Sequence, residues 1–127
     1  MTVSHTLTVR WRDTDAFGHV NHAVFLTYFE EGRDRFLEPV FGSPPVYVVV
    51  RVEMDFLREL RLERRQATVT VEVERIGRTS VVLRESLLDV EENLVARSRT
   101  TIVRWDEAKR APMELTRAER AALLEER

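Results

Sequence analysis

The sequence contains no cysteine. Disulfides, thiolate metal sites and a cysteine nucleophile are therefore excluded, which suits the reducing cytoplasm where we expect the protein to work. Lysine is almost absent as well, since Lys109 is the only one and arginine supplies the other strongly basic side chains. No apolar run approaches the ~20 residues of a membrane-spanning helix, and residues 1–10 lack the apolar stretch of a signal peptide.

Neither acidic nor basic side chains predominate in the sequence. The 127 residues carry a formal net charge of -2, and no long block of acidic or basic side chains appears. Bulk electrostatics therefore gives no indication of a nucleic acid or a membrane as partner. There is no low-complexity linker and no internal repeat, so we expect one domain, residues 1–127, that buries roughly two-thirds of its unfolded surface.

Hydrophobic periodicity predicts a strand followed by one long helix. The strand has alternating apolar positions, which are Val3, Leu7, Val9 and Trp11. The helix is expected to begin at His22 or Ala23 and to end near Leu37, before Pro39. Its first half is apolar on nearly all sides, so it should be covered on several sides.

Four more strand-like runs follow the turn at residues 42–45. The first run is expected to present one apolar face, formed by Val46, Val48, Val50, Val52, Met54 and Phe56. In the second run Val69, Val71 and Val73 share a face. One helix followed by consecutive strands predicts an α+β fold, with an antiparallel sheet of about five strands against the helix. A capping-box pattern at Thr116 and Glu119 predicts a short C-terminal helix.

The stretch RDTDAFGHVNHAVFLTYFEEGR, residues 12–33, concentrates polar groups where the long helix begins. The first N–H groups of a helix have no partner within the helix and form the positive end of its dipole. Asn21 can cap some of them, and others remain able to bind a carbonyl oxygen or oxyanion. Asp15 lies just upstream, and a base or nucleophile beside an oxyanion site is what acyl transfer requires.

This stretch resembles the signature of hotdog-fold acyl-CoA thioesterases of the 4-hydroxybenzoyl-CoA thioesterase type. The resemblance continues through residues 58–60 (REL), 74–80 (ERIGRTS) and 103–112 (VRWDEAKRAP) and covers most of the chain. It implies a hotdog fold, in which the sheet wraps around one long central helix. It also implies hydrolysis of an acyl-CoA thioester to a free acid and CoA, with no metal and no redox cofactor.

The resemblance assigns roles to individual residues. Asp15 matches the catalytic carboxylate, which attacks the thioester carbonyl or activates a water. Gly18 matches the glycine that lets the backbone approach the substrate. The backbone N–H of His22 matches the carbonyl polariser, and its side chain falls where one branch of the family has a functional histidine. Asn21 replaces an aromatic residue of that branch and resembles the HVN pattern of long-chain acyl-CoA relatives.

The resemblance also implies a CoA site and an assembly. Arg78, Thr79 and Ser80 stand where relatives contact the CoA phosphates and pantetheine. Family members form dimers, often paired into tetramers, with active sites between subunits. We therefore expect a homo-oligomer, a dimer or tetramer, in which Glu59 is a candidate for the contribution of the partner subunit.

Other functions fit the sequence less well. A calcium loop at residues 13–24 fails because Phe17 and Val24 occupy positions that need oxygen ligands. No two histidines stand at helical metal spacing with a nearby carboxylate, and no GxSxG or Walker motif is present. Asp13 is better explained by turn hydrogen bonds than by catalysis. A non-catalytic acyl-CoA-binding hotdog module remains the alternative function, and a hotdog hydratase is disfavoured by the match at Asp15.

Overall fold

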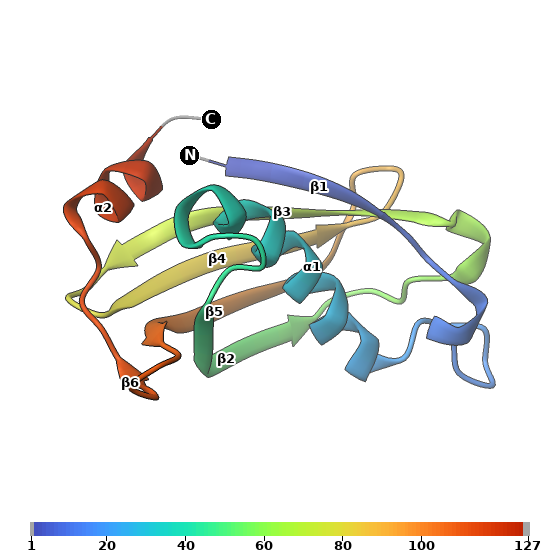
Figure 1. Cartoon of the computed structure of the whole chain (residues 1–127). Helices are drawn as coiled ribbons and strands as arrows, with labels where there is room; N and C mark the ends of the chain where they lie inside the picture. Colours follow the sequence, from blue (N-terminus) through green and yellow to red (C-terminus); the bar gives the residue numbers. More distant parts are fainter. Residues whose placement is uncertain (1, 126–127) are drawn as a thin grey trace.

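The computed structural model describes residues 2–125, apart from the side chains of Thr2 and Arg64. Along the chain the elements are β1 (Thr2–Thr8), η1 (Trp11–Asp13), α1 (His22–Phe41), β2 (Tyr47–Phe56), η2 (Leu62–Arg64), β3 (Gln66–Ile76), β4 (Ser80–Leu88), β5 (Leu94–Asp106), β6 (Ala111–Pro112) and α2 (Arg117–Leu124) (Figure 1). Among the described residues, no helix is both long and apolar enough to cross a membrane.

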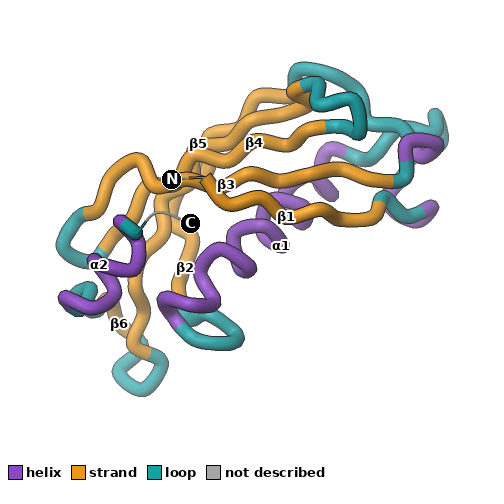
Figure 2. The backbone as a smooth tube through the Cα atoms, turned by 90° about the horizontal axis from the view of Figure 1, so that it is seen from above, coloured by secondary structure: helices purple, strands orange, loops and turns teal. Residues whose placement is uncertain are grey.

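The strands form one antiparallel sheet in the order β1-β3-β4-β5-β2, and the short β6 pairs with β5. Helix α1 packs on β1, β3 and β4, and the sheet curves around it (Figure 2). Aromatic side chains of α1, among them Phe25 and Phe29, are buried in the same core cluster as Val69 and Leu83 of the sheet. The predicted α+β architecture, with one long helix against an antiparallel sheet and a short C-terminal helix, is confirmed.

Helix α1 begins where the sequence predicts and ends later. Asn21 is its N-cap, and its side-chain oxygen accepts a hydrogen bond from the backbone N–H of Ala23 at 2.9 Å. The expected end near Leu37 is wrong, because the helix continues through Pro39 to Phe41. Proline removes one backbone donor, but burial of Phe41 favours another turn, and the Gly42 N–H still donates to the Glu38 carbonyl.

Two strand predictions also need correction. Strand β1 ends at Thr8, so Trp11 lies in η1 and is 80% exposed instead of sharing the buried face with Val9. In β2 a bulge interrupts the ladder between Val49 and Arg51, which pair with consecutive residues of β5. Because one extra residue flips the alternation, Val48 and Val52 cannot share the single apolar face that the sequence predicts.

A buried ion pair joins α1 to the inner face of the sheet. The Arg33 guanidinium donates to both carboxylate oxygens of Glu85, from Nε at 2.7 Å and from Nη2 at 3.0 Å. The Thr100 hydroxyl also donates to Glu85, at 2.7 Å. Every buried side-chain nitrogen and oxygen in the described part of the chain has a hydrogen-bond partner, so these charges are buried without an unsatisfied group.

Candidate active site

Asp15 opens a tight loop between η1 and α1. Thr14 and Val20 form an isolated bridge across the loop, and the Asp15 N–H donates to the His19 carbonyl at 2.8 Å. Gly18 has a φ of 81°, in the left-handed region that favours glycine, and a Cβ there would meet open space. The glycine is therefore required by the turn of the backbone, while its free face stays open to an approaching molecule.

The Asp15 carboxylate is exposed and only half engaged. Its Oδ1 accepts hydrogen bonds from the backbone N–H groups of Phe17 at 2.9 Å and His19 at 3.3 Å. Its Oδ2 has no hydrogen-bond partner within residues 2–125. The loop therefore fixes the orientation of the carboxylate and leaves one oxygen available to attack a carbonyl or to accept a proton from water.

The first turn of α1 leaves one donor free. The Ala23 N–H is capped by the Asn21 side chain and the Val24 N–H by the Asn21 carbonyl, both at 2.9 Å. The N–H of His22 has no acceptor in the part of the chain that the structure describes, and it stands at the positive end of the helix dipole. Asn21 thus serves as the cap, and the His22 backbone remains able to polarise a carbonyl.

The His22 ring packs against aromatic side chains. Its centroid lies 4.7 Å from the ring of Phe56 at the end of β2 and 6.3 Å from that of Phe25. This contact connects the start of the helix to the last residue of β2. It gives the His22 side chain a packing role, and a chemical role for the ring remains a prediction.

Asp13 stabilises the chain just before the Asp15 loop. Its carboxylate accepts hydrogen bonds from the Tyr28 hydroxyl at 2.6 Å and from the backbone N–H of Arg10 at 3.0 Å, and its side chain is buried. Burial raises the pKa of Asp13, but the hydrogen bonds from Tyr28 and Arg10 outweigh it and hold that pKa below its usual value. The same burial, with the Asp13 hydrogen bond, raises the pKa of Tyr28.

His19 and Glu59 meet at the rim of this loop. The two side chains approach to 2.6 Å between His19 Nε2 and Glu59 Oε2. The sequence analysis predicts that Glu59 acts in the site of a partner subunit. It does not predict the contact between His19 and Glu59, because the two residues are far apart in the chain and share no motif. In one chain Glu59 already lies beside the Asp15 loop, and its role in a partner's site stays a prediction.

The predicted CoA-binding residues lie elsewhere. Arg78 and Thr79 lie in the turn between β3 and β4, and Ser80 is the first residue of β4, at the opposite end of the sheet from the Asp15 loop (Figure 1). There Arg78 pairs with Glu114 at 2.7 Å, and the Thr79 carbonyl accepts from the Arg104 N–H at 2.8 Å. A single chain therefore does not bring these residues together with Asp15.

Exposed apolar side chains occur on the Asp15 loop, on α1 and on the edge strand β2, a feature that sequence reasoning did not anticipate. Phe17 at the tip of the loop is 81% exposed, and Leu26, Val52 and Phe56 are 48%, 37% and 46% exposed. Leu26 is in the second turn of α1, and Val52 and Phe56 are on the inner face of the edge strand β2. Exposed apolar side chains on an edge strand favour a ligand site or an interface between subunits.

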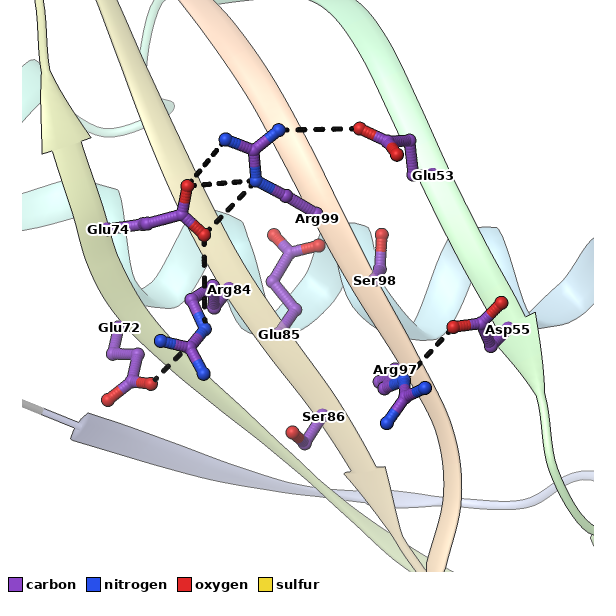
Figure 3. A pocket seen from close by; sticks show the side chains of 10 residues that line it. All are labelled: Glu53, Asp55, Glu72, Glu74, Arg84, Glu85, Ser86, Arg97, Ser98 and Arg99. Atoms are coloured by element: carbon purple, nitrogen blue, oxygen red, sulfur yellow. Dashed lines mark hydrogen bonds and ion pairs between the residues drawn. The ribbon is translucent and has the colours of Figure 1, made fainter.

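The outer face of the sheet offers a contrasting hollow of about 400 Å³ (Figure 3). It is lined by charges that are paired with one another across neighbouring strands. The side chains involved are Glu53, Asp55, Glu72, Glu74, Arg84, Arg97 and Arg99. Arg99 holds the pKa of Glu74 below its usual value. Because its charges are already paired with one another, this hollow is a poorer candidate for catalysis than the Asp15 loop.

Comparison with known proteins identifies the family. The sequence profile of the thioesterase-like superfamily matches residues 9–123. The chain belongs to the thioesterase-like superfamily. Among solved structures, this thioesterase is similar to one from Thermus thermophilus that was crystallised with coenzyme A and zinc. The two sequences are 29% identical, and the structures superpose with a TM-score of 0.88. The alignment covers 96% of this chain and 97% of that one. A search of curated protein sequences finds no match.

More distant structures share the fold of this thioesterase. A predicted thioesterase from Bacillus stearothermophilus has 24% identity and a TM-score of 0.86, with 97% of this chain and 94% of that one covered. A 1,4-dihydroxy-2-naphthoyl-CoA thioesterase from Synechocystis has 19% identity and a TM-score of 0.83, with 97% and 96% covered. The predicted hotdog fold and thioesterase family are therefore confirmed, and the roles of individual residues stay predictions.

Proposed function

We propose that this protein hydrolyses the thioester bond of an acyl-CoA, with Asp15 and the backbone N–H of His22 as its chemical centre. The observation that carries the proposal is that the loop leading into α1 holds both groups with unused hydrogen-bonding capacity. Within residues 2–125, one carboxylate oxygen of Asp15 and the N–H of His22 have no hydrogen-bond partner. Membership in the thioesterase-like superfamily and the similarity to a thioesterase solved with coenzyme A support the choice of substrate.

The proposed reaction begins when the acyl carbonyl oxygen accepts a hydrogen bond from the His22 N–H. As a nucleophile adds to the carbonyl carbon, negative charge develops on that oxygen, and one such donor typically lowers the barrier by ~3 kcal/mol. The nucleophile is either the Asp15 carboxylate itself or a water that gives its proton to Asp15. The carbon–sulfur bond then breaks, CoA leaves as a thiolate, and water supplies the hydroxyl of the free acid.

We further propose that the working unit is a homo-oligomer with sites shared between subunits. Strand β2 is one edge of the sheet, and its inner face carries the exposed Val52 and Phe56. Such an edge favours pairing with a second copy. Antiparallel pairing of two β2 strands about a two-fold axis reverses one sheet relative to the other. It would bring the partner's Arg78 to the end of the sheet where Asp15 lies. A shared site could then contain both residues, although they lie at opposite ends of the sheet within one chain.

The first experiment measures thiol release from a panel of short-chain, long-chain and aromatic acyl-CoAs with a chromogenic thiol reagent. The absence of cysteine keeps the protein itself from reacting. Wild type is compared with Asp15→Asn and with Asp55→Asn, a matched control for an exposed carboxylate on the outer face. Turnover that only Asp15→Asn abolishes supports the proposal. Saturable acyl-CoA binding without turnover in wild type would replace it with the binding-module function.

Subunit mixing tests the shared site. Asp15→Asn and Arg78→Ala proteins are each assayed alone and after exchange of subunits, with molar mass measured by light scattering. A shared site predicts that the mixture regains turnover, because one site of a mixed dimer has Asp15 from one chain and Arg78 from the other. A monomeric molar mass, or a mixture no more active than the average of its components, contradicts the shared site.

A further inference from the structure

The His19–Glu59 pair gives the candidate active site an additional component. Its two side chains approach to 2.6 Å and are 37% and 47% exposed. The other Glu59 oxygen, Oε1, accepts a hydrogen bond from Arg61 Nη1 at 3.3 Å, and Arg61 Nε donates to Glu63 at 2.7 Å. The Glu59 carboxylate is thus held between an imidazole on one side and a guanidinium on the other.

This pair acts on the residue that closes the Asp15 loop. The backbone N–H of His19 donates to Asp15 Oδ1 at 3.3 Å, and its carbonyl accepts from the Asp15 N–H at 2.8 Å. The backbone of His19 also forms a bridge with Arg61, and the next N–H, that of Val20, donates to the Leu60 carbonyl at 2.7 Å. The segment after β2 therefore holds the end of the loop through its backbone and through Glu59.

We propose that Glu59 and His19 are positioning residues, which fix the Asp15 carboxylate by anchoring the end of its loop to the segment that follows β2. The inference rests on the proposed function for its catalytic consequence. Neither side chain is assigned a step in the reaction. Their effect is on the orientation of the carboxylate, and a reacting group displaced by about 1 Å can lose up to about a hundredfold in rate.

The exposure of the pair separates positioning from general stability. Polar contacts between exposed side chains contribute little to the free energy of unfolding, because solvent competes for them and the side chains lose entropy on pairing. Loss of this pair should therefore leave global stability unchanged. The effect should instead appear locally, in the loop whose last residue carries the imidazole.

The test uses Glu59→Ala, Glu59→Gln, His19→Ala, the Glu59→Ala/His19→Ala double variant, and Glu63→Gln as the matched control. Glu63→Gln breaks the neighbouring pair with Arg61 and leaves the His19 contact in place. Glutamine retains an acceptor oxygen for the imidazole, so Glu59→Gln should keep most of the activity. We expect Glu59→Ala and His19→Ala each to lower kcat about tenfold with KM within about twofold, and the double variant to lower it no further.

A second measurement does not depend on turnover. The solvent-exchange rates of the Phe17 and His19 amide protons, both donors to Asp15, are measured by NMR well below the thermal unfolding midpoint. Both rates should rise in Glu59→Ala and stay at the wild-type value in Glu63→Gln. If wild type hydrolyses no acyl-CoA, the proposed function fails, while these exchange rates still decide whether the pair orders the loop.

Three results would overturn the positioning role. Unchanged kcat and unchanged exchange in Glu59→Ala would show that the pair does not hold the loop. An equal rise of exchange throughout the protein, with a lower unfolding midpoint, would show a global effect. A rise in KM at constant kcat would show that Glu59 contacts the substrate instead of positioning Asp15.

Discussion

Two aspartates close together in the sequence, Asp13 and Asp15, have opposite surroundings. The Asp13 side chain is buried, and both of its oxygens accept hydrogen bonds, from Tyr28 and Arg10. The Asp15 side chain is exposed, and one oxygen is bound to loop amides while the other has no partner in the part of the chain that the structure describes. The same residue type therefore supports the fold at one position and is available for chemistry at the other. What separates them is whether both oxygens of the carboxylate accept hydrogen bonds from the described residues.

The largest expected effect concerns Asp15. In Asp15→Asn the side chain keeps its shape and can still accept from the Phe17 amide, but it loses the oxygen that we propose as nucleophile or base. We expect kcat for acyl-CoA hydrolysis to fall about 10²–10⁴-fold, with the thermal unfolding midpoint unchanged. A folded Asp15→Asn protein with wild-type turnover would show that Asp15, like Asp13, has no role in catalysis.

A third carboxylate, Glu85, extends the comparison into the core. It is buried with Arg33, so Glu85→Ala leaves an uncompensated charge under α1. We expect the free energy of unfolding to fall by about 3–5 kcal/mol, measured by urea denaturation. The double variant Arg33→Met/Glu85→Leu is the control, because removal of both charges should restore most of that loss.

Substitution of Asp13 should lower the free energy of unfolding by a moderate amount that depends on pH. Asp13→Asn weakens the hydrogen bonds with Tyr28 and Arg10, and we expect a loss of about 1–3 kcal/mol in the free energy of unfolding. Because folding lowers the pKa of Asp13, the folded protein binds fewer protons there than the unfolded chain. Its contribution is therefore present above the usual pKa of 3.8 and is lost as pH falls toward the folded-state pKa.

Urea denaturation of wild type and Asp13→Asn between about pH 3 and pH 6 checks that sign. The difference in unfolding free energy between the two proteins should shrink as the pH falls. A difference that stays constant over this range would show that Asp13 does not titrate differently in the folded and unfolded states.

The smallest effect is expected for an exposed and paired carboxylate. Glu74 binds Arg99 on the outer face of the sheet, far from the loop, where solvent screens the pair. Glu74→Gln should change neither turnover nor the urea midpoint measurably. A clear loss of either would mean that pairing alone does not distinguish a neutral surface carboxylate from a functional one.

The sequence predicts those parts of the fold and site that depend on neighbours in the chain. Asn21 was expected to cap α1 and does, and the Thr116–Glu119 capping box is present with both hydrogen bonds. The Asp15 loop was also located from its motif. These features depend on local backbone geometry, which a short stretch of sequence specifies.

Other parts depend on contacts between distant segments. The end of α1 at Phe41 follows from burial against the sheet, which outweighed the local signal of Pro39. The bulge in β2 depends on the register of its pairing with β5. The sequence of β2 by itself shows only the alternation of apolar residues. The His19–Glu59 contact and the distance of Arg78 from Asp15 are consequences of topology, so no motif in the sequence indicates them.

The bulge at Val50 has a consequence for solubility. An open edge strand with apolar residues is a template for uncontrolled aggregation, because identical strands can add to it in many registers. A bulge increases the local twist and interrupts the regular row of backbone hydrogen-bonding groups. Strands from other molecules therefore find few registers in which they fit this edge, and growth into fibrils is disfavoured.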